Sequence, residues 1–128
     1  MASEFDDIAF SQAWVAAWNA HDVDAVLRHF HDEVIFTSPV AVHIGFAPDG
    51  VVKGKDALRS YWLEALRRNP GLHFDLTACW RGVNTVVIGY RNQLGHDRVE
   101  VLTFLGALVI EGHGLFGRPL AVSEGVER

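Results

Sequence analysis

Residues 72–81, with the sequence LHFDLTACWR, decide the fold class because their apolar side chains recur at every second position. The apolar set consists of Leu72, Phe74, Leu76, Ala78 and Trp80. Alternation of this kind is typical of a β-strand that buries one face. We therefore predict a long strand here, with these five side chains on its buried face.

The chain that follows this strand continues the same pattern. Residues 82–84 (GVN) and 94–97 (LGHD) are turn-like, and further strands are predicted at 85–92, 98–104 and 108–115. Short turns between consecutive strands are typical of an antiparallel meander. The second half of the chain therefore predicts a mainly antiparallel sheet, whose long strands are expected to curl.

The first part of the chain has helical periodicity instead. One face of a first predicted helix contains Phe10, Trp14, Ala17 and Trp18. Ser3 or Asp6 has the side chain expected to cap the start of this helix. Asp22 is the expected N-cap of a short second helix, because residues 19–22 (NAHD) interrupt the first pattern.

A third helix is predicted from its end signals. Asp56 lies in its first turn and Arg67 and Arg68 lie in its last turn, as the helix dipole favours. Residues 69–71 (NPG) are expected to end it. Its apolar stripe contains Leu58, Tyr61, Trp62, Ala65 and Leu66.

The segment between the second and third helices begins with residues 34–37 (VIFT), which predict a strand. Residues 39–53 mix prolines and glycines with valines, and they predict a long irregular connection or a loose hairpin of the kind that is often functional. Helices followed by antiparallel strands predict one α+β domain over residues 1–128. We expect three N-terminal helices packed on a strongly curved sheet, which together enclose a cone-shaped apolar pocket.

The composition excludes several classes of partner. The formal net charge is −5, from 11 basic and 16 acidic residues, and the basic residues are scattered, so no nucleic acid or membrane surface is expected as a partner. No apolar run approaches the ~20 residues of a membrane span, and the first residues lack signal-peptide features, so a cytoplasmic location is expected. The single cysteine, Cys79, is interpreted as a small buried side chain rather than a reactive thiol.

Three segments carry a resemblance to a known superfamily. Residues 14–26 (WVAAWNAHDVDAV), 34–40 (VIFTSPV) and 54–62 (GKDALRSYW) resemble nuclear transport factor 2-like proteins of the SnoaL-like type. This superfamily includes polyketide cyclases and ketosteroid isomerases, and also proteins that bind without catalysis. The resemblance implies the cone-shaped fold and a homodimer that pairs the outer sheet faces, where Val99, Val101 and Thr103 are expected to lie.

The same resemblance can be followed residue by residue to ketosteroid isomerase. The tyrosine of its oxyanion hole corresponds to Trp14, and its general-base aspartate corresponds to Ser38. Its second, protonated aspartic acid corresponds to Glu100, which keeps the carboxyl group. A serine does not abstract a proton from carbon unaided, so the resemblance implies a chemistry different from the known isomerase mechanism.

Glu100 is the first catalytic candidate from the residues themselves. Alternation places it on one strand face with Leu102 and Phe104, and a carboxyl group in an apolar pocket has the raised pKa that suits acid–base chemistry. The alternative is a structural ion pair between Glu100 and Arg98 or Arg91.

His113 is the second catalytic candidate. It lies between Gly112 and Gly114, where a backbone or a ligand can approach closely, and alternation places it on the face of Val109 and Leu115. Near Glu100 it would complete an acid–base dyad. The alternative is a hydrogen-bonded histidine of the core or of an interface.

The remaining candidates are expected to line the pocket and bind a ligand. They are Trp14, Trp18, Phe36, Ser38, Tyr61, Trp80, Tyr90, Asn92 and Leu102. No histidine spacing indicates a metal site, and no glycine-rich loop indicates a nucleotide site, so no cofactor is expected.

Three functional hypotheses follow. The first is proton transfer within a small hydrophobic carbonyl compound, of the isomerase, cyclase or dehydratase type. The second is binding of an apolar metabolite without turnover, and the third is a dimeric structural domain with a filled cone. An open void lined by tryptophan, tyrosine and glutamate would favour the first two over the third.

Overall fold

The computed structural model describes residues 5–118 and confirms the expected α+β fold. Within this range the helices are α1 (Asp7–Asn19), α2 (Val23–Leu27), α3 (Pro39–His43) and α4 (Lys55–Arg68). The strands are β1 (Phe30–Thr37), β2 (Val51–Lys53), β3 (Phe74–Gly82), β4 (Thr85–Asn92), β5 (Asp97–Leu105) and β6 (Leu108–Phe116). No helix in the described part of the chain has the length and apolar character that crossing a membrane requires.

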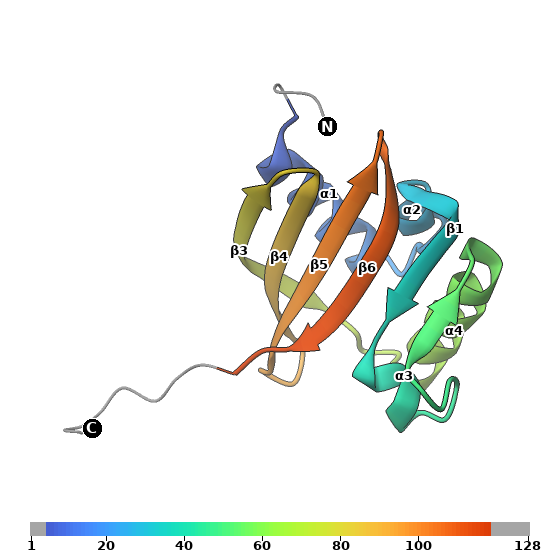
Figure 1. The fold of residues 1–128 in the computed structure, drawn as a ribbon. Coiled ribbons are helices and arrows are strands. Elements are labelled where there is room, and N and C mark those ends of the chain that lie inside the picture. Colours follow the sequence, from blue (N-terminus) through green and yellow to red (C-terminus); the bar gives the residue numbers. More distant parts are fainter. Residues whose placement is uncertain (1–4, 119–128) are drawn as a thin grey trace, which may run out of the picture.

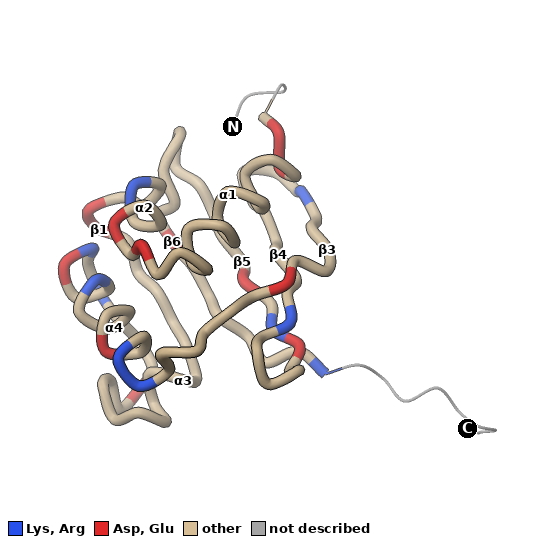
Figure 2. Tube along the Cα trace, turned by 180° about the vertical axis from the view of Figure 1, so that it is seen from behind, with Lys and Arg blue, Asp and Glu red and all other residues tan. Residues whose placement is uncertain are grey.

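The six strands form one curved, unclosed sheet in the order β2-β1-β6-β5-β4-β3. Neighbouring strands are antiparallel except for β1 and β6, which are parallel. The long strands β3 to β6 follow one another as the predicted meander (Figure 1). Helices α1, α2 and α4 lie on the concave face, where α1 packs on β3 and α4 packs on β1 (Figure 2).

The helix ends follow from the local sequence. Asp6 accepts a hydrogen bond from the backbone N–H of Ala9 (2.9 Å), and Asp22 accepts one from Ala25 (3.0 Å), so both predicted N-caps are confirmed. The alternative cap, Ser3, lies outside the described residues. The first helix begins at Asp7, and its buried tryptophans, Trp14 and Trp18, pack against Phe74 of the sheet.

Aromatic side chains make up much of the core between the helices and the sheet. Trp14 stacks on Phe74 with ring centroids 5.9 Å apart, and it also contacts Tyr90 at 5.4 Å. Trp18 meets Trp62 of α4 edge to face at 5.0 Å. These contacts join α1, α4 and the sheet around one apolar interior.

The segment 39–53 is more regular than the sequence predicted. Ser38 caps α3 by accepting from the N–H of Val40 (3.2 Å), and Pro39 occupies the first turn, where its missing N–H costs nothing. The chain then returns as β2, which pairs with β1. Gly50 has a φ of 74° and lies against the carbonyl of Ser38, so the turn between α3 and β2 requires a residue without Cβ.

Two strands contain a register shift that reverses the expected orientation of their side chains. In β3 the partners Leu76↔Tyr90 are followed by Ala78↔Gly89, which leaves Thr77 as an extra residue. In β6 the extra residue is Ile110. A bulge of this kind moves every later side chain to the opposite sheet face.

Candidate functional site

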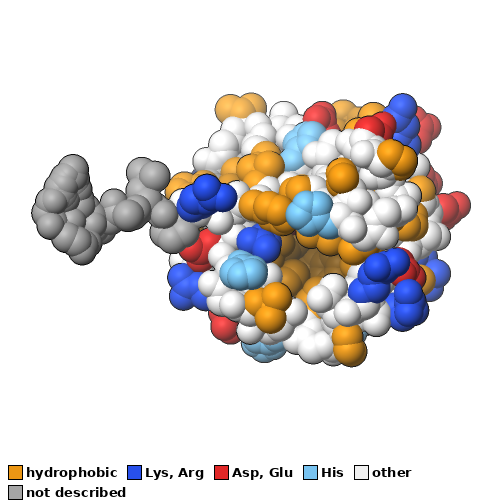
Figure 3. Space-filling model, turned by 90° about the horizontal axis from the view of Figure 1, so that it is seen from below, with side chains coloured by type: hydrophobic (Ala, Val, Ile, Leu, Met, Phe, Trp, Pro, Cys, Tyr) orange, Lys and Arg blue, Asp and Glu red, His pale blue; other side chains and the backbone are white. Residues whose placement is uncertain are grey.

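A cavity of about 290 Å³ lies between the concave sheet face and helices α1 and α4. Its mouth opens beside α3, the end of α4 and the turn between β4 and β5. Figure 3 shows this hollow, with apolar side chains inside it and basic and histidine side chains near its rim. The cavity is lined by Trp14, Trp18, Phe36, Ser38, Pro39, Val40, His43, Tyr61, Trp62, Ala65, Asn69, Leu72, Phe74, Tyr90, Asn92, Gln93, Leu94, Arg98, Glu100, Gly114, Leu115 and Phe116.

Glu100 supplies the carboxyl group in the cavity wall. Its side chain projects from β5 and is 5% exposed, and the Tyr90 hydroxyl donates to its Oε1 at 3.3 Å. Burial raises the pKa of Glu100 to about 8, although the hydrogen bond from Tyr90 acts in the opposite direction. At neutral pH the carboxyl group is therefore largely protonated. The alternative of an ion pair is absent within residues 5–118, where Arg91 binds Asp97 instead (3.1 Å).

A second polar pair faces the same space from the opposite side. The Tyr61 hydroxyl of α4 donates to Ser38 Oγ at 2.9 Å, and Ser38 Oγ also accepts from the N–H of Val40. Burial raises the pKa of Tyr61 to about 12, so its hydroxyl stays protonated. A serine hydroxyl has two lone pairs and one hydrogen. Because both lone pairs are occupied, the Ser38 hydrogen is left to donate to a ligand.

Gly114 of β6 lies where the two polar pairs converge. A methyl group added at this glycine would lie 3.5 Å from Glu100 Oε1 and 3.7 Å from Ser38 Oγ. The missing side chain thus leaves space between the carboxyl and the hydroxyl. At Gly112 the corresponding space is filled, because a Cβ there would lie 2.8 Å from the Phe36 ring.

Two buried indole N–H groups beside the cavity lie without a partner among the described residues. The Nε1 atoms of Trp14 and Trp18 are buried and have no hydrogen-bond partner within residues 5–118. Both side chains line the cavity. A buried donor without a partner carries a free-energy cost, which the packing of these two aromatic side chains offsets.

Eight of the residues expected at the site line this cavity. They are Glu100, Trp14, Trp18, Phe36, Ser38, Tyr61, Tyr90 and Asn92. The Asn92 side-chain oxygen accepts from the N–H groups of Leu94 and His96, both at 3.0 Å, so it also holds the β4–β5 turn. Leu102 is fully buried beside Gly112 and belongs to the core beneath the cavity.

His113 lies on the other face of the sheet, so the expected dyad with Glu100 is not formed. It pairs across the sheet with Val101, and its ring nitrogens lie 2.6 Å from Thr37 Oγ1 and 2.7 Å from Glu111 Oε2. The bulge at Ile110 is the physical reason, because Val109 faces inward while His113, an even number of residues later, faces outward.

Trp80 is the second residue whose orientation differs from the prediction. The bulge at Thr77 turns its side chain to the outer face, where it is 54% exposed. Sequence reasoning also missed Arg98 as a residue of the cavity, having considered it only as a partner of Glu100. The signal was present, since Arg98 precedes Glu100 by two positions in a regular part of β5.

Comparison with known proteins agrees with this architecture. The family model described as a SnoaL-like domain matches residues 11–115. The chain belongs to the SnoaL-like family. A SnoaL-like protein of unknown function from Burkholderia thailandensis is 39% identical, with a TM-score of 0.81, and the match covers 88% of this chain and 94% of that one.

More distant solved structures share the fold. TerC, crystallised with polyporic acid, is 15% identical with a TM-score of 0.70, over 87% of this chain and 91% of TerC. AclR, a putative hydroxylase from Streptomyces galilaeus, is 17% identical with a TM-score of 0.67, over 87% of this chain and 88% of AclR. No curated protein matches the sequence.

Proposed function

We propose that this SnoaL-like protein binds a small hydrophobic carbonyl compound in the cavity and moves a proton within it, without a cofactor. The reaction would be of the isomerase, cyclase or dehydratase type. The observation that carries the proposal is the Glu100 carboxyl group, which is buried in the cavity wall and has its pKa raised to about 8. A group with a pKa near the working pH both accepts and returns a proton efficiently.

The geometry supports one assignment of roles. The Ser38 hydroxyl, which accepts from Tyr61, donates to the carbonyl oxygen of the substrate. The ionised fraction of Glu100 takes a proton from the carbon next to that carbonyl, and the protonated Glu100 then gives it to a different atom of the substrate. The Tyr90 hydroxyl stabilises the Glu100 carboxylate before the first transfer and again after the second. With His113 on the outer face, Glu100 performs both transfers.

The test is exchange of carbon-bound hydrogen in D₂O, followed by NMR, with aryl methyl ketones as probes. The wild-type protein is expected to accelerate exchange next to the carbonyl, with a rate that rises through about pH 8, where half of Glu100 is ionised, and levels off above it. Glu100→Gln is nearly isosteric and should abolish the acceleration, whereas Glu33→Gln, on the exposed part of β1, should not change it. Equal rates in wild type and Glu100→Gln would remove Glu100 from the mechanism.

Binding without turnover is the second candidate function. The apolar lining and the Ser38 hydroxyl support binding of an acceptor but by themselves supply no proton transfer. An open cavity of about 290 Å³ does not favour the filled cone of the third hypothesis. Saturable binding of a ketone without any exchange would favour this second function.

We also propose a homodimer through the outer face of the sheet. Val99 and Val101 lie on this face, next to the exposed Trp80 and Leu115 (54% and 46% exposed). Burial of such apolar area is a usual cause of association. Light scattering after size exclusion tests this proposal, and Val101→Lys is expected to give a monomer that retains the cavity.

A further inference from the structure

The charge of the cavity lining points to a property of the ligand. Among the lining residues within 5–118, Arg98 and Glu100 are the only Arg, Lys, Asp or Glu side chains. They lie two positions apart on β5, so both project from the same sheet face, Glu100 deeper and Arg98 nearer the mouth. Since Glu100 is largely uncharged at neutral pH, Arg98 is left as an uncompensated positive charge in the wall.

The Arg98 guanidinium is held in place without a carboxylate partner. It lies 4.3 Å over the Phe116 ring, and it donates to the carbonyl of Asp97 (2.9 Å) and to Nδ1 of His96 (3.4 Å). These bonds use two of its five N–H groups, and the other three have no acceptor within residues 5–118. The nearby Asp97 carboxylate is already bound by Arg91.

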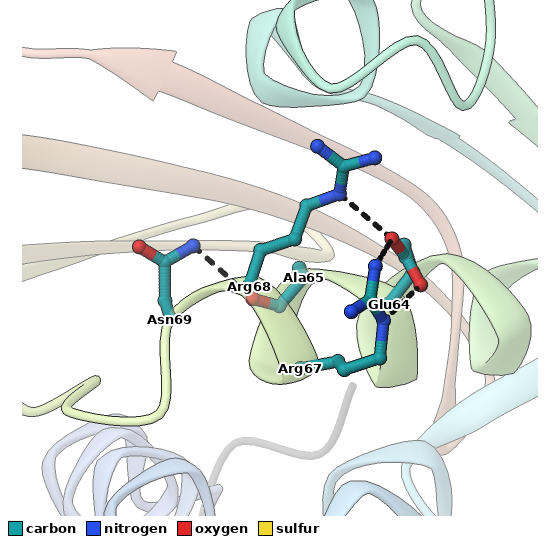
Figure 4. A network of polar contacts seen from close by, with 5 residues as sticks. All are labelled: Glu64, Ala65, Arg67, Arg68 and Asn69. Carbon is teal, nitrogen blue, oxygen red and sulfur yellow. Dashed lines mark hydrogen bonds and ion pairs between the residues drawn. The ribbon is translucent and has the colours of Figure 1, made fainter.

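The two arginines at the end of α4, unlike Arg98, are paired with a carboxylate. Arg67 and Arg68 both bind Glu64, each at 2.7 Å, at the end of α4 (Figure 4). Neither of them belongs to the cavity lining. Asn69 and Ala65, which do line the cavity, are joined by a hydrogen bond of 3.1 Å. Arg98 is therefore the arginine of this region that is available to a molecule in the cavity.

We infer that the ligand is an aromatic or otherwise flat monoanion, with a carboxylate or acidic enol oxygen bound by Arg98 and its carbonyl end placed between Glu100 and Ser38. A guanidinium with free parallel donors suits a planar oxyanion. Residues two apart on a strand are separated by roughly 7 Å, about the distance between para substituents of one benzene ring. The inference rests on the proposed function, because it concerns the ligand of the same cavity.

The test compares 4-acetylbenzoate with its neutral isostere 4-acetylbenzamide by titration calorimetry at pH 7 and low salt. Wild type is expected to bind the benzoate at least about tenfold more tightly. Arg98→Gln should reduce this preference to less than about twofold. Arg59→Gln, on the far part of α4 and paired with Asp24, is the matched control and should retain the preference.

Equal affinity for the two probes, a preference that survives in Arg98→Gln, or no binding of either probe would overturn the inference. The acetyl group of both probes also reports hydrogen exchange, which separates this inference from the proposed function. A charge preference without Glu100-dependent exchange would support the anionic ligand and overturn the proton transfer. Glu100-dependent exchange with no charge preference would support the proton transfer and overturn the anionic ligand.

Discussion

Two glutamates, one inside the cavity and one at its mouth, have pKa values moved in opposite directions. Burial raises the pKa of Glu100 to about 8, whereas hydrogen bonds from Arg67 and Arg68 lower the pKa of Glu64 to about 2. The first carboxyl has a neutral hydroxyl as its partner, and the second has two cations in solvent. At neutral pH the carboxyl group inside the cavity is therefore mostly protonated, whereas the carboxyl group at the rim is ionised.

The largest expected effect is on the pH dependence of stability. The folded-state pKa of Glu100, about 8, lies above its ordinary value of 4.5, so the folded protein keeps a proton that the unfolded chain has lost. The contribution of Glu100 is thus fully present below about pH 4.5 and is lost as the pH rises to about 8. The loss is on the order of 5 kcal/mol.

Glu100→Gln should remove this loss, because its amide stays neutral at every pH. Urea unfolding between pH 4.5 and 9 measures the effect as the difference between the wild-type and variant curves. Two parallel curves would mean that Glu100 is not desolvated, and the contrast with Glu64 would disappear.

Trp14→Ala is expected to have the next largest effect. Trp14 is 1% exposed and contacts the rings of Phe74, Tyr90 and Trp18, so its truncation should cost about 3–5 kcal/mol of unfolding free energy. A near-neutral result would show that the cavity extends through this position. The measurement is chemical denaturation at pH 5, where most of the contribution of Glu100 is still present.

The sequence predicted the order of elements better than the direction of individual side chains. Alternation placed Glu100 correctly because β5 is regular from Arg98 to Thr103. The same rule failed for Trp80 and His113, since a bulge depends on the partner strand and leaves no mark in the alternating pattern itself.

The start of α3 could have been predicted from the local sequence, whereas the meeting of residues at Gly114 could not. Ser38 followed by Pro39 is a recognisable helix start, yet the valine-rich sequence and the five-residue length of α3 hid it. Glu100 of β5 and Ser38 at the start of α3 converge on Gly114 of β6, and Tyr61 of α4 reaches them through Ser38. No sequence spacing encodes that meeting, so it required the structure.

Gly114→Ala tests whether the ligand lies between Glu100 and Ser38 in the cavity interior. Its expected effect is on binding alone. The added methyl group would make ordinary contacts of 3.5–3.8 Å with Glu100, Ser38 and Phe36, so the protein should keep its stability. The methyl group would also occupy the space between the carboxyl and the hydroxyl. Affinity for 4-acetylbenzoate should fall about tenfold, which corresponds to about 1.4 kcal/mol.

Gly71→Ala is the matched control for that substitution, because a methyl group at Gly71 has no atom within 4 Å. Affinity should be unchanged there. If Gly114→Ala bound the probe as tightly as wild type, the ligand would not pass between Glu100 and Ser38, and the assigned roles of these two residues would be wrong.

The smallest expected effect is that of Glu64→Gln at the rim. Exposed ion pairs contribute little to stability because solvent screens them, so the melting temperature should hardly change. The substitution releases Arg67 and Arg68 from their shared carboxylate and removes one negative charge near the mouth, so the local net charge becomes more positive. Association of an anionic probe should therefore become slightly faster at low salt, and stopped-flow binding measures it. If the association rate did not change, steering by the rim would be absent, and Arg98 alone would account for any preference for anions.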